Sequence, residues 1–179
     1  MLSRVFLLGF MGCGKSTIGR LLAGSMAYDF KDLDHEIELV RKASISDIFM
    51  QSGEQEFRLL EQQTLHSMVG YDRAIVACGG GTPCFFDNMH WMNSNGITVF
   101  LNTSPDDLML RLQSEQAHRP LIRDFDSSGL KQFIHRKLEE RLPFYTQAQL
   151  QVMDSGDKVK SAQWIQQYVL SLQVGRNGL

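Results

Sequence analysis

Residues 9–16 read GFMGCGKS, and this stretch decides the fold. It matches the pattern G-x-x-x-x-G-K-[S/T] in full, and Thr17 follows it. The apolar run Val5–Leu8 before it predicts a strand covered on both faces, and the residues from Ile18 onward have helical spacing. A glycine-rich turn between a strand and a helix directs backbone N–H groups toward an anion, and the helix N-terminus adds partial positive charge. The sequence therefore predicts a phosphate-binding loop.

The residue types of this loop fit a nucleotide and its metal ion. Glycine lets the backbone approach phosphate oxygens that a side chain would keep away. The Lys15 amine can reach the β- and γ-phosphates, and the Ser16 hydroxyl can bind Mg²⁺. Cys13 has two interpretations, an oxidation-sensitive thiolate near a helix N-terminus or a small filler. The nucleotide-binding residues predicted in the loop are Gly12, Cys13, Gly14, Lys15, Ser16 and Thr17.

Beyond the loop, short apolar runs alternate with segments of helical periodicity, a pattern typical of βα units and a parallel sheet. We predict one α/β domain over residues 1–179, with three α/β/α layers around a five-stranded parallel sheet. A polar stretch without periodicity predicts a lid within residues 113–127. Helices are predicted after the loop, over Gly53–Val69, from Pro105, around Leu130–Leu138 and around Ile165–Leu172. The predicted strands are Val5–Leu8, Tyr28–Leu33, Ala74–Cys78, Ile97–Leu101 and Leu150–Met153.

The composition restricts the class of protein. The chain is 43% hydrophobic and 21% charged, which is ordinary for a globular protein, and its net charge of −2 makes nucleic acid an unexpected main partner. The longest apolar runs are far shorter than the roughly 20 residues needed to span a bilayer, and the N-terminus lacks a signal-peptide core. We therefore expect no membrane partner and a cytoplasmic location. The cysteines have no C-x-x-C spacing, which predicts neither a disulfide framework nor a zinc site.

Two acidic residues, Asp32 and Asp34, follow the second predicted strand. Ligands of open α/β sheets bind at this end of the strands, and residues two apart in an extended segment share a face. One carboxylate can hold Mg²⁺, and the other can orient a substrate hydroxyl. The alternative for Asp34 is a helix cap before His35.

Arginines and glycines farther along supply a second set of candidates. Arg58 and Glu61 have helical spacing, which fits either a surface ion pair or a glutamate that holds a carboxylate-binding arginine. Gly79–Gly81, directly after a strand, is typical of backbone that a ligand approaches, the alternative being a flexible connector. Arg119 can bring positive charge onto phosphates when a lid closes. Arg141 ends a predicted helix, where it can instead merely offset the helix dipole.

Taken together, these motifs resemble those of the shikimate kinase family. The resemblance implies a P-loop kinase fold of the nucleoside-monophosphate-kinase-like type, with a closing lid. It spans nearly the whole chain, from Val5 to Val169, although Asp154–Lys160 and the lid depart from the family pattern. The motifs that carry it are Gly9–Thr17, Asp32–Asp34, Glu56–Glu61, Gly79–Thr82, Arg119–Leu121 and Glu140–Tyr145.

The resemblance also implies a role for each matching residue. Lys15, Asp34 and Arg119 are the implied catalytic residues, with Asp34 as the base or the group that orients the hydroxyl. Ser16 and Asp32 are the implied Mg²⁺ ligands. Arg119 and Arg111 join the loop in binding the nucleotide, Arg111 near the adenine. The implied substrate-binding residues are Asp34, Arg58, Gly79, Gly80, Gly81 and Arg141.

The implied activity is ATP-dependent phosphorylation of the 3-hydroxyl of shikimate, a step in aromatic amino acid biosynthesis, by a monomeric enzyme that uses ATP and Mg²⁺. Two alternatives remain open at this point. One is a related sugar-acid kinase of the gluconate type, because gluconate is also a carboxylated polyol. The other is a non-catalytic module that binds ATP as a switch for a protein partner.

Overall fold

The computed structural model describes residues 4–119 and 121–176, so Pro120 of the Arg119–Leu121 motif lies outside the described residues. Strands and helices alternate along the chain, and no described helix is long and apolar enough to cross a membrane. The elements are β1 (Arg4–Leu8), α1 (Lys15–Met26), β2 (Asp29–Asp32), α2 (Leu33–Arg41), α3 (Ile45–Ser67), η1 (Met68–Gly70), β3 (Ala74–Ala77), η2 (Thr82–Cys84), α4 (Asn88–Asn95), β4 (Ile97–Asn102), α5 (Pro105–Glu115), η3 (Gln116–His118), α6 (Ser127–Tyr145), β5 (Leu150–Met153) and α7 (Lys158–Arg176).

The sheet has five parallel strands in the order β2-β3-β1-β4-β5, which confirms the predicted fold class. Leu7 of the central strand β1 pairs with Ala77 of β3 on one side and with Val99 of β4 on the other. β2 and β3 lie on one side of β1, and β4 and β5 lie on the other side, so the direction in which strands are added reverses beside β1. Ligands of open α/β sheets bind at such a point, outside the carboxyl ends of the strands. The phosphate-binding loop follows β1 and therefore lies there.

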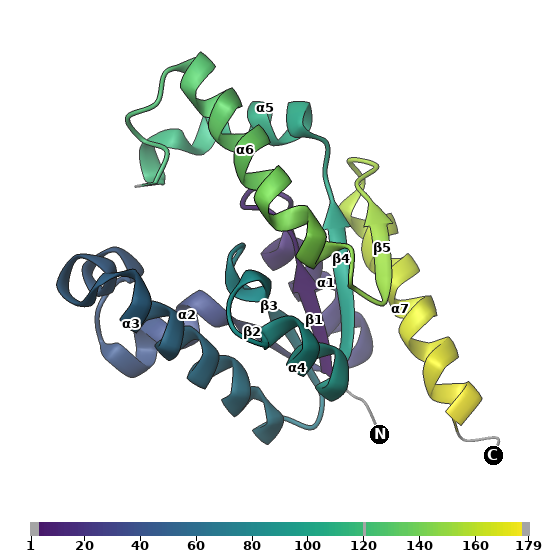
Figure 1. Ribbon diagram of the computed structural model, residues 1–179. Helices are drawn as coiled ribbons and strands as arrows, with labels where there is room; N and C mark the ends of the chain where they lie inside the picture. Colours follow the sequence, from purple (N-terminus) through teal and green to yellow (C-terminus); the bar gives the residue numbers. More distant parts are fainter. Residues whose placement is uncertain (1–3, 120, 177–179) are drawn as a thin grey trace.

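Helices cover both faces of the sheet (Figure 1). Because successive side chains of a strand point to opposite faces, β1 contributes to two apolar cores. Val5 and Leu7 belong to a core with residues of α1, α5, α6 and α7, whereas Phe6 and Leu8 belong to a core with α2, α3 and α4. All four side chains are fully buried. This burial on both faces anchors β1 and fixes the position from which the loop departs.

The helix predicted over Gly53–Val69 is present, but a helical segment that the sequence did not predict precedes it. The helix begins at Ile45 because Ser44 caps it, its hydroxyl accepting a hydrogen bond of 3.1 Å from the Asp47 N–H. Gly53 has φ 76° and ψ 174°, a non-helical conformation that separates the two helical segments of α3, so the second segment begins just after Gly53 as predicted. The residues after Gly53 resume the helix beyond this kink, and the kink sets the position of Arg58 on the second segment.

The helix around Leu130–Leu138 was predicted to end at Arg141, and this end is wrong. α6 continues through Pro143 to Tyr145. Proline offers no N–H to the carbonyl four residues earlier, that of Glu139, which usually breaks a helix. Glu139 and Pro143 are both exposed, so water can reach this carbonyl, and the interruption is tolerated near the helix end. Arg141 therefore lies within a helix and does not cap one.

α4 is absent from the sequence prediction, and α2 was considered only in the alternative that made Asp34 a helix cap, whereas the residue at the cap position is Asp32. β2 ends at Asp32 and α2 begins at Leu33, so Asp34 lies in the first turn of a helix. An acidic residue is favourable there because of the helix dipole. The prediction that Asp32 and Asp34 share one face of an extended segment is therefore wrong in its geometry, although both line the same cavity.

Candidate active site

The phosphate-binding loop joins the end of β1 to the start of α1. Gly12 and Gly14 have φ values of 81° and 97°, a conformation that favours glycine over other residues. Gly14 immediately precedes Lys15, the first residue of α1, so the free N–H groups at the helix N-terminus face the loop. This arrangement suits the binding of an anion.

The Lys15 side chain folds over its own loop. Its Nζ donates hydrogen bonds to the carbonyls of Gly9 (2.7 Å) and Phe10 (3.0 Å) and lies 3.7 Å from Cys13 Sγ. The contacts hold a positive charge at the mouth of the loop. Cys13 is only 1% exposed, which favours the interpretation of a small filler because oxidation requires access to the sulfur.

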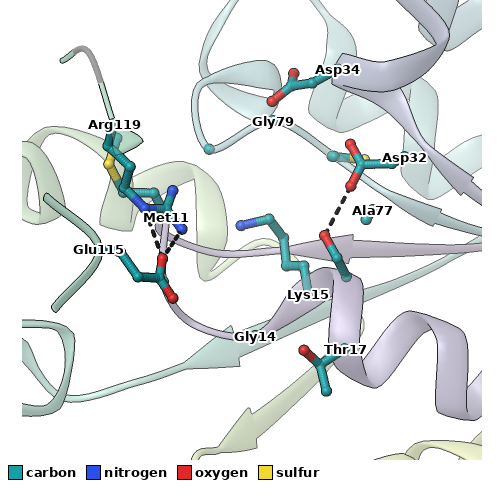
Figure 2. Close-up of a pocket in the computed structure, with 14 residues that line it drawn as sticks. Met11, Gly14, Lys15, Thr17, Asp32, Asp34, Ala77, Gly79, Glu115 and Arg119 are labelled. Carbon is teal, nitrogen blue, oxygen red and sulfur yellow. Dashed lines mark hydrogen bonds and ion pairs between the residues drawn. The ribbon is translucent and has the colours of Figure 1, made fainter. Parts of the chain in front are cut away.

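A cavity of about 260 Å³, the loop cavity, opens beside the phosphate-binding loop (Figure 2). Lys15 of the loop and Arg119, which follows η3, both point into it, so two cations from distant parts of the sequence share one space. Cys13 and Arg111 do not line it. The predicted residues that do line it are Gly12, Gly14, Lys15, Ser16, Thr17, Asp32, Asp34, Gly79, Gly80 and Arg119.

Ser16 and Asp32 form a small oxygen-rich site in the loop cavity. The Ser16 hydroxyl donates a hydrogen bond of 2.8 Å to Asp32 Oδ2 (Figure 2). Mg²⁺ typically binds one or two protein oxygens and completes its shell with waters and substrate phosphates, which fits a hydroxyl beside a carboxylate. Within the described part of the chain, no three His, Cys, Asp or Glu residues gather to hold a metal by themselves. The donor set therefore fits a divalent ion that arrives with a nucleotide.

Asp34 is the carboxylate with the most perturbed environment in the site. Burial raises its pKa most, and the negative charges of Asp32 and Glu61 raise it further, whereas the Lys15 charge lowers it. The resulting pKa is about 6. Such a group is mainly ionised at neutral pH and binds a proton more readily than an ordinary aspartate, as a general base requires.

A second cavity of about 300 Å³, the arginine cavity, adjoins the first. Arg58 of α3 and Arg141 of α6 line it, together with the apolar rings of Phe49 and Phe57. Leu121, which sequence analysis did not single out as a site residue, also lines it. The two cavities share five wall residues, which are Met11, Asp34, Gly79, Gly80 and Arg119.

The Arg58 guanidinium is fixed by a buried carboxylate. Its Nη1 donates to Glu61 Oε2 at 2.8 Å, and Glu61 is only 1% exposed. The second oxygen of Glu61 accepts a hydrogen bond of 2.5 Å from the buried Thr82 hydroxyl. Of the two interpretations of the Arg58–Glu61 spacing, the surface ion pair is therefore wrong. Thr82 supports Arg58 through Glu61, a role that helical spacing could not reveal because Thr82 lies on another element.

The run Gly79–Gly81 makes room for charged side chains. None of the three residues has a positive φ, so backbone conformation does not explain the glycines. A Cβ on Gly79 would lie 2.9 Å from Glu61 Oε1. A Cβ on Gly80 would lie 2.9 Å from Arg141 Nη1, and a Cβ on Gly81 would lie 2.9 Å from Arg58 Nη1. All three distances are below those that real Cβ atoms show. The flexible-connector alternative is therefore not needed.

Arg119 lies within the predicted lid segment. Its Nε donates to the Glu115 carboxylate at 2.9 Å, and the pair lies at the wall of the loop cavity. Both members of this pair are substantially exposed, so the interaction is weak and can be exchanged for another anion. Glu115 was not predicted from the sequence because an exposed i, i+4 pair has no distinctive signal.

Arg111 is outside both cavities and belongs to a cluster behind the loop. It donates to Asp154 Oδ2 at 2.6 Å and to the Gly12 carbonyl at 3.4 Å. Lys158 donates to the same carboxylate at 2.8 Å and to the Cys13 carbonyl at 3.4 Å. Burial would raise the pKa of Asp154, but these hydrogen bonds hold it well below its ordinary value. The cluster ties α5 and α7 to the outer side of the loop.

The fold and the site together define a class of protein. The phosphate-binding loop lies at the carboxyl edge of a parallel sheet and lines the loop cavity. The adjoining arginine cavity contains Arg58 and Arg141. Asp34 and Arg119 line both cavities. This is the construction of a P-loop kinase of the nucleoside-monophosphate-kinase-like type, which holds a nucleotide on one side and a small acceptor on the other.

Comparison with known proteins gives the family. The sequence model of the shikimate kinase family matches residues 11–173. Shikimate kinase of Bacteroides thetaiotaomicron is 43% identical over 146 residues, 82% of this chain and 83% of that protein. A crystal structure of shikimate kinase from the same species has a TM-score of 0.89 at 39% identity and covers 94% of this chain and 98% of its own. Shikimate kinase from Acinetobacter baumannii in complex with shikimate has a TM-score of 0.86 at 32% identity, covering 96% and 94%. The chain belongs to the shikimate kinase family.

Proposed function

We propose that this protein transfers the γ-phosphoryl group of ATP to the 3-hydroxyl of shikimate. The observation that carries the proposal is that the loop cavity and the arginine cavity meet at Asp34 and Arg119. A phosphoryl donor in one cavity and an acid bearing hydroxyls in the other would face each other across these two residues. Family membership supports the same substrate pair.

On the nucleotide side, Gly12, Gly14 and Thr17 would bind phosphate oxygens together with Lys15. Ser16 and Asp32 would hold Mg²⁺, which when bound neutralises charge on the phosphates. Arg119, released from Glu115, would add its charge to the transferring group as residues 113–127 close over it. The cluster of Arg111, Asp154 and Lys158 would support the loop from behind, with Arg111 toward the adenine.

On the acceptor side, Arg58 and Arg141 would bind the shikimate carboxylate, because a guanidinium matches a carboxylate with paired hydrogen bonds. Asp34 would accept a hydrogen bond from the attacking hydroxyl. As the new O–P bond forms and the bond to the β-phosphate oxygen breaks, the hydroxyl proton would pass to Asp34. The backbone of Gly79–Gly81 would line the path of the substrate, since these residues carry no side chains.

The activity is tested with purified protein and Mg·ATP, by measuring ADP release with and without an acceptor. We expect release that depends on shikimate and exceeds that with gluconate or nucleoside monophosphates by orders of magnitude. Preference for gluconate would indicate a sugar-acid kinase, and ATP binding without any acceptor-dependent turnover would indicate a switch module. Family membership does not favour either alternative.

Replacing Arg58 or Arg141 by alanine should raise the KM for shikimate by about 10- to 150-fold in each case. This range follows from the roughly 1.5–3 kcal/mol that a hydrogen bond to a charged group contributes. The KM for ATP should change little, because neither arginine lines the loop cavity. Initial-rate measurements with each substrate varied in turn separate the two constants.

The matched control is Arg136→Ala, which removes an exposed arginine from the same helix as Arg141. It should leave both KM values within about twofold, because exposed ion pairs contribute little. Shikimate affinity that stays unchanged in both the Arg58 and Arg141 variants would remove the carboxylate-binding role from these arginines.

Gly81→Ala should weaken shikimate binding without removing any polar group. The added methyl would lie 2.9 Å from Nη1 and 3.0 Å from Nη2 of Arg58, so the guanidinium must shift from the position in which Nη1 donates to Glu61. We expect a rise of about tenfold in the KM for shikimate, the equivalent of one lost charge-assisted hydrogen bond. Gly70→Ala is the control, because nothing lies within 4 Å of a Cβ there. Equal KM values for both variants and the wild type would show that the glycine run does not position Arg58.

A further inference from the structure

Arg58 is held by two acids that differ in exposure. Its Nη1 donates to Glu61, whose side chain is 1% exposed, while its Nη2 donates at 3.2 Å to Glu54, whose side chain is 60% exposed. The Arg58 Nε also points to Glu54 Oε1, at 3.4 Å. The buried acid is fixed by Thr82, whereas the exposed one is free to turn into solvent.

The contacts with Glu54 use one edge of the guanidinium. A guanidinium has two paired sets of N–H donors, one on the Nε–Nη2 edge and one on the Nη1–Nη2 edge. Glu54 occupies the Nε–Nη2 edge, and Glu61 takes a donor of Nη1. Glu54 therefore takes one of the two edges through which a carboxylate could bind this guanidinium with paired hydrogen bonds.

Arg58 does not need Glu54 in order to stay in place. The guanidinium carbon lies 4.1 Å from the ring centre of Phe85 and 5.1 Å from that of Phe57. These aromatic contacts hold a cation, and the Arg58 side chain is only 12% exposed. With the Glu61 ion pair on one side and the aromatic rings on the other, the guanidinium stays in place without the exposed acid.

Glu54 also has somewhere to move. It lines a separate surface groove of about 400 Å³ with Gln55, Phe85 and Phe86, and it does not line the arginine cavity. Arg58 is the residue that separates groove and cavity, because it lines both. Glu54 can therefore release the guanidinium by swinging into the groove, with no rearrangement of the cavity wall.

We propose that Glu54 is an internal competitor that lowers the affinity of Arg58 for the carboxylate of the acceptor. The proposal rests on the proposed function, in which Arg58 binds that carboxylate. Glu54 occupies an edge of the guanidinium and adds a negative charge beside it, and both effects oppose an incoming anion. The phosphorylated product keeps the same carboxylate, so Glu54 also limits product affinity. Glu54 thus sets substrate affinity without being a catalytic residue.

Glu54→Gln tests this proposal, with Glu56→Gln as the matched control. Both substitutions remove one negative charge from an exposed position of α3, but no ion pair involves Glu56 within the described part of the chain. Calorimetric titration with shikimate should show about two- to fivefold tighter binding for Glu54→Gln, the range of an exposed ion pair, and a smaller change for Glu56→Gln. The KM for shikimate should fall in the same proportion, while kcat and the KM for ATP stay unchanged.

A second ligand isolates the carboxylate. The methyl ester of shikimate has no negative charge, so its affinity should not respond to Glu54→Gln. Weaker shikimate binding by Glu54→Gln would show that Glu54 positions Arg58. Unchanged binding would show that Glu54 does not affect substrate affinity. Either result overturns the proposal. Wild-type protein that neither binds nor phosphorylates shikimate would instead reject the proposed function, which is a separate outcome.

Discussion

Lys15→Met should reduce kcat by about a hundred- to a thousandfold while the protein remains folded. Lys15 brings the one positive charge of the phosphate-binding loop into the loop cavity, where charge moves from the γ-phosphate onto the leaving phosphate during transfer. Removing one preorganised donor to a developing charge typically costs two to three orders of magnitude in rate. Methionine keeps an unbranched apolar stem of similar length and removes the charged amine together with its hydrogen bonds to the Gly9 and Phe10 carbonyls. ADP release at saturating shikimate and ATP gives kcat directly.

The control for this prediction is Lys158→Met. Lys158 also lies beside the loop, with its Nζ 3.4 Å from the Cys13 carbonyl, but it binds Asp154 on the outer side. The control should lower the affinity for ATP modestly and leave kcat within about tenfold, because its charge does not line the loop cavity. Comparable losses of kcat in both variants would mean that the general positive field of the loop matters, and not the position of Lys15.

The phosphate-binding loop could be predicted because its signal is local. Strand, glycine turn and helix follow one another within residues 5–22, and glycines are demanded by the positive φ of Gly12 and Gly14. The five strands were likewise predicted, but only the three inner strands, β1, β3 and β4, are the continuous buried runs expected of a parallel sheet, whereas the edge strands β2 and β5 are partly exposed. Helix boundaries were less accurate, since periodicity detects neither the single capping hydrogen bond of Ser44 nor the continuation of α6 past Pro143, where one hydrogen bond is missing.

Contacts between distant elements could not be predicted from spacing. Thr82 reaches Glu61 across 21 residues, and Asp154 joins Arg111 across 43. Neither pair shares an element, so no periodicity relates its members. The resemblance to a family placed Arg111 near the adenine, but it gave no sign of Asp154 as its partner. Asp34 shows a different limit, because it lines the expected cavity from the first turn of α2, and the two interpretations of Asp34 placed it either on an extended segment or at a helix cap.

Asp34→Asn should lower kcat/KM for shikimate by about 10²- to 10⁴-fold, the usual contribution of a general base. Asparagine has the same shape and can still accept a hydrogen bond, but it cannot take the proton of the attacking hydroxyl. The loss therefore measures proton transfer and charge, and not packing. The variant is assayed at pH 8, where the wild-type carboxylate is ionised.

The pH dependence of the wild type provides an independent measure of the same group. The pKa of Asp34 is about 6, and the base must be ionised, so kcat/KM should fall as pH falls through 6 and be about tenfold lower at pH 5. The Asn variant should lack this step, because the asparagine side chain does not titrate. A wild-type profile that stays flat down to pH 5 would contradict the assignment of Asp34 as the base.

The same substitution should leave thermal stability unchanged or raise it at pH 8. Because burial raises the pKa of Asp34 above its ordinary value of 3.8, the folded protein binds the proton more tightly than the unfolded chain does. Ionisation therefore destabilises the fold, with no effect below pH 3.8 and the full effect above pH 6. Asparagine is neutral at every pH, so the difference in Tm between variant and wild type should be largest at pH 8 and shrink toward pH 4. A variant less stable than the wild type at pH 8 would show that the Asp34 carboxylate supports the fold, whereas a more stable and inactive variant would show that its buried charge serves only the reaction.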